Sequence, residues 1–296
     1  STLMSVYLKD KTKDIKVTDE EIKKAYDENK EAYTQQANAA ELNLIYVPYK
    51  SDEAKANADK ILAEVKQNKD KFGGKMEINK YIDHTLLKAT ATKEEIIKLC
   101  NEAKEYNFYS VCVNSGIVKF AADQVNGTDV KVAAVVGFPL GAMSDAAKIF
   151  EAKKAIEDGA SEIDMVINIG ALKDKEYDYV RNEIKGIKEA IGTNVLKVII
   201  ETCYLTEEEK VKACELSLEA NADFVKTSTG FGTGGATYED VSLMKKIVGD
   251  KAEVKASGGV KDLATAKKYI ELGATRLGTS SGIEILKGLK VEDGKY

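Results

Sequence analysis

The sequence lacks residue types that several common functional sites require. Its 296 residues include no tryptophan, two prolines and a single histidine, His84. One histidine cannot build a clustered His/Cys zinc site, and a Ser-His-Asp triad has only this histidine to use. The sequence therefore disfavours a metal hydrolase, and we expect His84 to be a hydrogen-bonded structural residue.

Cysteines and long apolar runs are also few. The four cysteines, Cys100, Cys112, Cys203 and Cys214, include no close C-x-x-C pair, so we expect reduced thiols and a cytoplasmic protein. No stretch approaches the ~20 apolar residues of a membrane span, and no signal peptide is visible. A net charge of −5 gives no overall field that attracts nucleic acid or an anionic membrane. A local basic pocket can still hold a phosphate.

Glycine is absent from the first quarter of the chain. Residues 1–72 contain none, and all 22 glycines lie from Gly73 onward. We therefore place a domain boundary at about residue 75, next to the Gly73-Gly74 joint, between an appended segment 1–75 and a domain 76–296. The appended segment is mainly helical by pattern, with Thr18 and Glu21 as a capping box, then a short strand and a second amphipathic helix.

The helix "VTDEEIKKAYDENKEAY" of this segment precedes a strand and an alanine-rich helix. In this respect it loosely resembles the chaperone region of parvulin-type peptidyl-prolyl isomerases. No recognisable parvulin catalytic core follows, so isomerase activity is not carried over. We expect an appended or grafted helical segment, or a fusion, without catalysis.

After the joint, short apolar runs alternate with amphipathic helices. The predicted strands span residues 81–87, 109–115, 131–138, 162–168, 196–202, 223–229, 253–258 and 275–281. Thr92 with Glu95 and Thr206 with Glu209 predict helix starts, and "DGASEIDMV", "ANADFVK" and "LGATRLG" supply Gly or Asn where helices end. Eight such units favour an α/β fold, a (β/α)8 TIM barrel with its active site at the C-terminal strand ends. An open doubly wound sheet is the alternative, but its G-x-G-x-x-G motif is absent.

Charged residues interrupt four consecutive predicted strands. They are Asp164, Lys197 with Glu201, Lys226 and Lys255. Because helices cover the outer face of such strands, these side chains are expected to face the barrel axis. An unpaired buried charge costs several kcal/mol, so the two acids are expected to compensate the lysines.

Three neighbouring lysines have a chemical use. A lysine becomes a nucleophile near neutral pH when burial and a second cation lower its pKa, and it can then form a Schiff base with a carbonyl substrate. From spacing alone, either Lys226 or Lys255 can be this nucleophile. The loops "SGGV" at 257–260 and "GTSSG" at 278–282 follow strands seven and eight, where barrels bind phosphate through backbone N–H groups.

The motifs "IDHTLL", "VCVNS", "VVGFPLG", "EIDMVIN", "LKVIIET", "FVKTSTGF", "VKASGG" and "LGTSSG" follow one another over residues 76–290. In order and spacing they resemble the deoxyribose-phosphate aldolase family. The resemblance implies a class I aldolase that reversibly cleaves 2-deoxy-D-ribose 5-phosphate into acetaldehyde and D-glyceraldehyde 3-phosphate, with no metal or organic cofactor.

The resemblance also implies residue roles. Lys226 matches the Schiff-base lysine, Lys255 the assisting lysine and Asp164 the proton-relay acid, while Lys197 pairs with Asp164. The positions that match the phosphate-binding segments are Thr229, Gly230, Gly258, Gly259, Gly278, Ser280 and Ser281.

Three further residues are weaker candidates. Asp83 is a candidate substrate contact, and Cys112 a candidate pocket residue, although a buried strand cysteine is more often plain packing. Tyr296 is a candidate mobile acid on the C-terminal tail, but the last helix is expected to end at the opposite barrel face.

The expected partner is a small phosphorylated aldehyde or sugar, without nucleic acid or membrane, and the expected assembly is a homodimer or higher homo-oligomer. Two alternatives stay open. One is another Schiff-base barrel, a transaldolase-like enzyme that acts on ketose phosphates. The other is a fusion in which the first segment has a chaperone or interaction role and the barrel is its carrier.

Overall fold

The computed structural model describes residues 77–289. The predicted helix-strand-helix of residues 1–75, its parvulin resemblance and the candidate acid Tyr296 lie outside the described residues. The domain boundary at about residue 75 stays a prediction.

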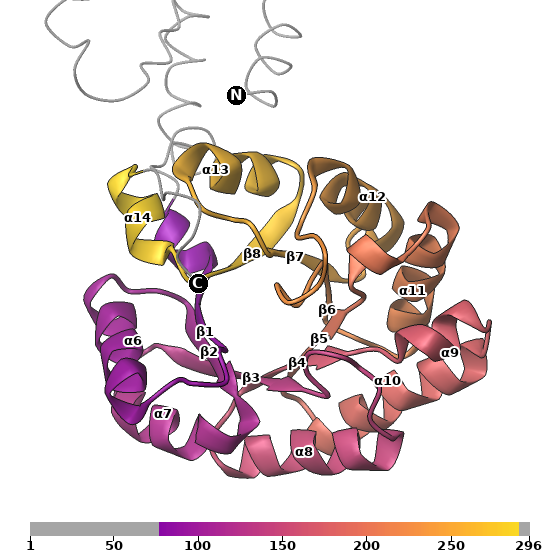
Figure 1. Cartoon of the computed structure of the whole chain (residues 1–296), viewed down its shortest axis with the longest axis horizontal. Coiled ribbons are helices and arrows are strands. Elements are labelled where there is room, and N and C mark those ends of the chain that lie inside the picture. The colour runs from indigo at the N-terminus through magenta and orange to yellow at the C-terminus, as the bar shows by residue number, and fades with distance from the viewer. Residues whose placement is uncertain (1–76, 290–296) are drawn as a thin grey trace, which may run out of the picture. The chain divides into compact units, whose positions relative to one another are not determined.

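Eight parallel strands form a closed barrel in which each strand pairs with the next and β8 pairs with β1 (Figure 1). The strands are β1 Ile82–Leu86, β2 Ser110–Asn114, β3 Lys131–Val136, β4 Glu162–Val166, β5 Val195–Ile199, β6 Phe224–Lys226, β7 Glu253–Ser257 and β8 Ala274–Thr279. This closure confirms the predicted (β/α)8 fold and excludes the open doubly wound sheet.

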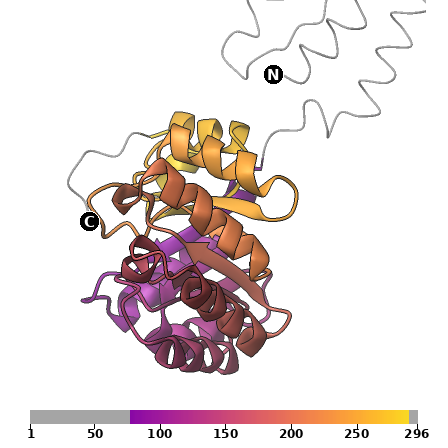
Figure 2. The same ribbon diagram turned by 90° about the vertical axis from the view of Figure 1, so that its right-hand side faces the viewer.

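Helices surround the strands on the outside of the ring, as the two views in Figures 1 and 2 show. The α-helices are α6 Lys93–Glu105, α7 Val118–Val125, α8 Asp145–Glu157, α9 Ile169–Lys173, α10 Tyr177–Ile191, α11 Glu207–Glu219, α12 Tyr238–Val248, α13 Leu263–Glu271 and α14 Gly282–Lys287. Short 3-10 helices are η1 Ile78–Tyr81, η2 Ser115–Ile117 and η3 Thr202–Tyr204. Within the described range, no helix has the length and apolar character to cross a bilayer.

The local start and stop signals act as the sequence predicts. Both Thr92 and Thr206 form complete capping boxes, at the starts of α6 and α11. The residues that end the helices before β4, β6 and β8 are Gly159, Asn221 and Gly273, and each has a positive φ, of 107°, 58° and 105°. A positive φ strains most side chains but is open to glycine and tolerated by asparagine, so these residues stop each helix before the next strand begins.

Strand β6 is shorter than predicted, because regular pairing stops at Lys226 instead of residue 229. Backbone hydrogen bonds continue for one more residue, with the Thr227 amide donating to the Lys255 carbonyl over 3.1 Å, and side chains then hold the chain. The Ser257 amide donates to the Thr227 hydroxyl over 3.1 Å, and the Thr229 amide donates to the Glu201 carboxylate over 3.2 Å. The chain after Lys226 is therefore an ordered loop held by its neighbours.

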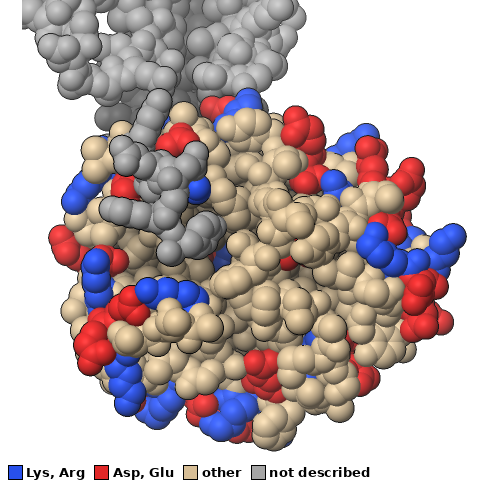
Figure 3. Space-filling model, in the orientation of Figure 1, with Lys and Arg blue, Asp and Glu red and all other residues tan. Residues whose placement is uncertain are grey.

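The main core lies between the strands and the helices, where outward residues such as Val111, Ile163 and Val198 are fully buried. A separate small apolar cluster, made by Leu87, Cys112, Ala133 and Val135, belongs to β1, β2, β3 and their ends. On the face in Figure 3, acidic and basic side chains intermingle around the rim, and the centre consists mostly of uncharged residues. The buried charges therefore stand apart from this rim, inside the barrel.

Candidate active site

Strand register brings the charged residues of neighbouring strands side by side. Asp164 on β4 is the Cα partner of Lys197 on β5, and Lys226 on β6 is the partner of Lys255 on β7. Partners in parallel strands project to the same face, and here that face is the barrel interior. For these four residues, the hydrogen bonds that join Asp164 to the three lysines confirm the prediction that they face the axis.

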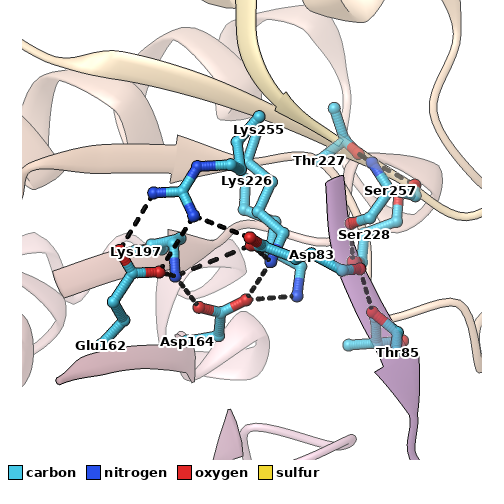
Figure 4. Close-up of polar contacts among 12 residues, drawn as sticks. Asp83, Thr85, Glu162, Asp164, Lys197, Lys226, Thr227, Ser228, Lys255 and Ser257 are labelled. Atoms are coloured by element: carbon cyan, nitrogen blue, oxygen red, sulfur yellow. Dashed lines mark hydrogen bonds and ion pairs between the residues drawn. The ribbon is translucent and has the colours of Figure 1, made fainter. Parts of the chain in front are cut away.

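Asp164 is the common partner of three lysines (Figure 4). Its Oδ1 accepts a hydrogen bond from Lys197 Nζ over 2.7 Å. Its Oδ2 accepts one from Lys226 Nζ over 2.7 Å and one from Lys255 Nζ over 2.8 Å. One carboxylate therefore fixes the positions of all three amines, and the two amines that the sequence could not rank share a single oxygen atom.

Three further charged residues complete the network next to Asp164 and the lysines. Asp83 on β1 accepts hydrogen bonds from Lys255, from the Ser110 hydroxyl over 2.6 Å and from Arg276 over 2.7 Å. Glu162 on β4 pairs with Arg276 over 3.0 Å and with Lys197 over 2.6 Å. We call Asp83, Glu162, Asp164, Lys197, Lys226, Lys255 and Arg276 the inner cluster.

The three lysines differ in their electrostatic surroundings. Burial lowers the pKa of Lys226, and Lys255 lowers it further, so the attraction of Asp164 does not restore its ordinary value. Burial alone would also lower the pKa of Lys255, but Asp164 and Asp83 outweigh it and raise that pKa above its usual range. The pKa of Lys197 is raised as well, because Asp164, Glu162 and Asp83 together outweigh burial and the repulsion of Lys255. Lys226 is therefore the amine that loses its proton most readily.

The Asp164 carboxylate remains ionised in this setting. Burial would raise its pKa, but the three adjacent lysines outweigh burial and hold the pKa well below its usual range. A permanent carboxylate between two amines can accept and return a proton through hydrogen bonds that already exist. The arrangement therefore joins an amine with a lowered pKa to a proton acceptor and a second, protonated amine.

The predicted phosphate segments come together at the ends of β6, β7 and β8. Gly258 packs so closely on the loop after β6 that a Cβ would lie 2.9 Å from the Gly235 Cα, whereas a Cβ on Gly259 would meet open space. Ser257 and Gly278 are Cα partners, and Ser280 and Ser281 follow β8. Whether these groups bind phosphate stays a prediction.

Thr229 and Glu201 have a contact that the sequence did not predict. The Thr229 amide and hydroxyl both donate to the buried Glu201 carboxylate. Glu201 was expected to compensate the lysines, but its carboxylate accepts hydrogen bonds from the Thr229 amide and the Cys203 thiol instead. Glu201 lies beyond the last residue of β5 with a positive φ of 55°, so it has left the strand alternation that would direct it to the axis.

The weaker candidates also have defined positions. Asp83 is fully buried beneath Lys255, and Cys112 is fully buried, with its thiol pKa raised by burial. His84 Nε2 donates to the Glu102 carboxylate over 2.8 Å on the outer side of β1, which agrees with a structural residue. No group of three or more His, Cys, Asp or Glu residues with the arrangement of a metal site occurs between residues 77 and 289.

Glu162 and Arg276 were missed by sequence reasoning, although a signal was present. Glu162 stands two residues before Asp164, and strand alternation places both side chains on the same face. Arg276 is a charged residue inside the last predicted strand. Glu162 begins one of the four strands in which charges were noted, whereas Arg276 lies in the eighth strand, outside those four.

Comparison with known proteins gives first the class and then the family. Residues 78–288 match the family model described as DeoC/LacD family aldolase. The barrel therefore belongs to the aldolase class.

Relatives at high identity define the family more closely. A deoxyribose-phosphate aldolase of Carboxydothermus hydrogenoformans is 64% identical over 216 residues, which cover 72% of this chain and 95% of that protein. One of Thermococcus kodakarensis is 63% identical over 219 residues, covering 72% and 97%. The chain belongs to the deoxyribose-phosphate aldolase family.

Solved structures agree with this assignment. The structure of "QR15, an Aldolase" has 46% sequence identity and a TM-score of 0.69, and the match covers 72% of this chain and 95% of that one. The tetrameric deoxyribose phosphate aldolase from Aeropyrum pernix has 31% identity and a TM-score of 0.67, with 75% and 95% covered.

Proposed function

We propose that the barrel is a class I aldolase that reversibly cleaves 2-deoxy-D-ribose 5-phosphate into acetaldehyde and D-glyceraldehyde 3-phosphate. Lys226 is the Schiff-base lysine, Lys255 the assisting lysine and Asp164 the proton-relay acid. The observation that carries these roles is the shared Asp164 carboxylate, which contacts one lysine of lowered pKa and one of raised pKa.

In the synthetic direction, the neutral Lys226 amine adds to the carbonyl carbon of acetaldehyde, and loss of water gives an iminium ion. The iminium withdraws electrons from the adjacent methyl group, so that Asp164, with Lys255 and a water molecule, removes a methyl proton and leaves an enamine. The enamine carbon then attacks the aldehyde of glyceraldehyde 3-phosphate. Water hydrolyses the resulting iminium, releases the product and restores the lysine.

Two buried groups support this sequence of steps. Lys197 holds the second oxygen of Asp164 over 2.7 Å, so the carboxylate keeps Oδ2 directed at the two reacting amines. Lys255 remains an ammonium because two carboxylates contact it. A neighbouring cation of this kind favours the neutral form of the nucleophilic amine.

The phosphate group of the substrate is assigned to the loops after β6, β7 and β8. The positions proposed to bind it are Thr229, Gly230, Gly258, Gly259, Gly278, Ser280 and Ser281. Positive φ values of 81° at Gly258 and 82° at Gly259 turn the backbone after β7, and backbone N–H groups of such turns bind anions. The open space at Gly259 leaves room for the ligand.

We further propose a cytoplasmic homo-oligomer. A related solved aldolase is described as a tetramer, and exposed apolar side chains, Leu140 at 75% and Phe150 at 72% of full exposure, lie after β3 and on α8. A transaldolase-like reaction is less well supported, because the relatives at 58–64% identity are named deoxyribose-phosphate aldolases.

Reductive trapping tests the proposed function. The full chain is treated with acetaldehyde and borohydride, digested and mapped by mass spectrometry. An ethyl adduct on Lys226 is expected, and addition of 2-deoxy-D-ribose 5-phosphate in place of acetaldehyde is expected to give the same labelled peptide. An adduct on Lys255 would reverse the two lysine roles, and the absence of any adduct would refute the Schiff-base mechanism. Cleavage that EDTA abolishes would instead indicate a metal-dependent aldolase.

A further inference from the structure

The inner cluster contains more positive than negative groups. Its members are at most 3% exposed, and they comprise three carboxylates and four cations. The carboxylates are Asp83, Glu162 and Asp164, and the cations are Lys197, Lys226, Lys255 and Arg276. Counted at their usual charges, the cluster has one positive charge in excess.

The other interior groups do not neutralise this excess by pairing with a lysine, because the buried Glu201 carboxylate after β5 accepts its hydrogen bonds from Thr229 and Cys203. At the corresponding interior positions, β2 contributes Ser110 and Cys112, and burial raises the pKa of the Cys112 thiol, which keeps it neutral. Strand β3 contributes the apolar Ala133 and Val135. An enclosed cluster with one uncompensated charge is unfavourable, so the balance is restored when one cation loses its proton.

Arg276 cannot be the group that does so. A guanidinium stays charged at any pH at which proteins fold. Its Nη1 and Nη2 donate to Glu162 over 3.2 and 3.0 Å, Nη1 also donates to Asp83 over 2.7 Å, and its Cζ lies 3.4 Å from the centre of the Tyr109 ring. Arg276 is thus a fixed charge, held by Glu162, Asp83 and the Tyr109 ring.

Lys226 is the group that best relieves the excess. Within the described range, Asp164 is the carboxylate at ion-pair distance from Lys226. Lys255 contacts both Asp83 and Asp164, and Lys197 contacts both Glu162 and Asp164. Removing the proton from Lys226 therefore sacrifices fewer ion pairs than removing it from either of the other lysines.

We propose that Arg276 and Glu162 are positioning residues that set the charge state of the Lys226 amine from deeper in the barrel: Arg276 favours the neutral amine, and Glu162 opposes it. Neither residue touches the substrate in this scheme. The inference rests on the proposed function, because it assigns an electrostatic origin to the reactivity of the Schiff-base lysine.

Paired substitutions with opposite expected effects test the proposal. The rate at which acetic anhydride labels Lys226 in the full chain is measured against pH by peptide mass spectrometry, together with the pH profile of kcat/KM. Arg276→Met removes a positive charge, favours the ammonium form and should slow labelling at neutral pH by about tenfold, with the acid limb moved to higher pH. Glu162→Gln should speed labelling and move the limb to lower pH.

Further variants separate charge from packing. Arg276→Lys keeps the charge and should label close to the wild-type rate. The double variant Arg276→Met with Glu162→Gln restores one excess positive charge and should return the profile toward wild type. Arg181→Met removes the other arginine of the chain, which lies on α10 and is 35% exposed, and should leave labelling unchanged.

The proposal is overturned if Arg276→Met and Glu162→Gln shift the profile in the same direction, or if neither shifts it while circular dichroism shows an intact fold. If Arg276→Met does not fold, Glu162→Gln and Arg276→Lys still show in which direction the charge at these positions shifts the pH profile of Lys226 labelling. Wild-type trapping keeps the two proposals apart. An adduct on Lys226 with no shift in the variants refutes only the inference, whereas no adduct refutes the proposed function itself.

Discussion

The barrel holds two buried ionic groups that differ in composition. The inner cluster lies among the strands and has four cations for three carboxylates. The second group, which we call the outer pair, consists of Lys148 on α8 and Glu183 on α10, fully buried and 2.5 Å apart. Lys148 also donates to the Val166 carbonyl over 2.8 Å, and Glu183 accepts from the Asn168 amide over 3.1 Å.

The two groups show how burial of charge can serve structure or chemistry. In the outer pair, one acid faces one base, and the remaining hydrogen bonds satisfy backbone groups where β4 ends. Burial lowers the pKa of Lys148 and raises that of Glu183, but the pair has no net charge because one cation faces one carboxylate. In the inner cluster cations outnumber carboxylates, and burial together with the neighbouring Lys255 lowers the pKa of Lys226.

The largest loss of activity is expected when Lys226 of the inner cluster is replaced. Lys226→Met removes the amine that forms the Schiff base in the proposed mechanism and should lower kcat/KM by about 10⁴-fold or more. Steady-state cleavage of 2-deoxy-D-ribose 5-phosphate measures the loss. Substantial residual turnover with an adduct on another lysine would show that the reactive amine is elsewhere in the cluster.

Asp164→Asn should lower kcat by about 10²- to 10⁴-fold, since an amide cannot accept the methyl proton. It also leaves three buried amines without their shared carboxylate, so unfolding is measured alongside turnover. Iminium formation, detected by trapping, should survive better than the complete reaction. If iminium formation and turnover fell equally, Asp164 would have a structural role instead of a role in proton transfer.

The outer pair should affect stability more than chemistry. Lys148→Met leaves Glu183 buried without its partner and should lower the free energy of unfolding by about 3–5 kcal/mol, as measured by urea denaturation. The double variant Lys148→Met with Glu183→Leu should recover much of this loss. If Lys148→Met also shifted the pH profile of kcat/KM, the outer pair would influence the chemistry as the inner cluster does, and the two groups would not differ in role.

The pH dependence of activity should follow the inner cluster. The reaction needs the neutral Lys226 amine, so kcat/KM rises with pH through its pKa, and a lowered pKa places this limb below the range of an ordinary lysine, about 10.4. Below the limb, activity should fall about tenfold per pH unit. The raised pKa of Lys255 keeps its ammonium form throughout this window. An acid limb at the ordinary lysine value would contradict the lowered pKa.

A solvent-exposed ion pair is expected to contribute least to the free energy of unfolding. Lys119 and Asp123 form an i,i+4 ion pair on α7, with side chains 66% and 57% exposed. Lys119→Ala should change the free energy of unfolding by only about 0.5 kcal/mol, because solvent screens the pair. A loss as large as that of Lys148→Met would mean that burial does not distinguish these ion pairs.

Much of the fold could be predicted because its signals are local. Capping boxes at Thr92 and Thr206, glycine or asparagine at helix ends and apolar runs of strand length all act within a few residues. The site was partly predictable for the same reason, since Asp164, Lys197, Lys226 and Lys255 each interrupt an apolar run. Glu201 was assigned wrongly to the lysine network because its positive φ, which turns it toward Thr229, has no reliable sequence signal.

The sequence by itself determined the order of strands and helices, the faces on which charges would lie and, through its motifs, the aldolase family. Only the tertiary structure decided which charges meet. Closure of β8 on β1 brings Arg276 to Asp83 across 193 residues of chain, and the number of carboxylates around each lysine follows from that closure. Because a pKa depends on distances and burial in three dimensions, the difference between Lys226 and Lys255 could not be obtained from spacing along the chain.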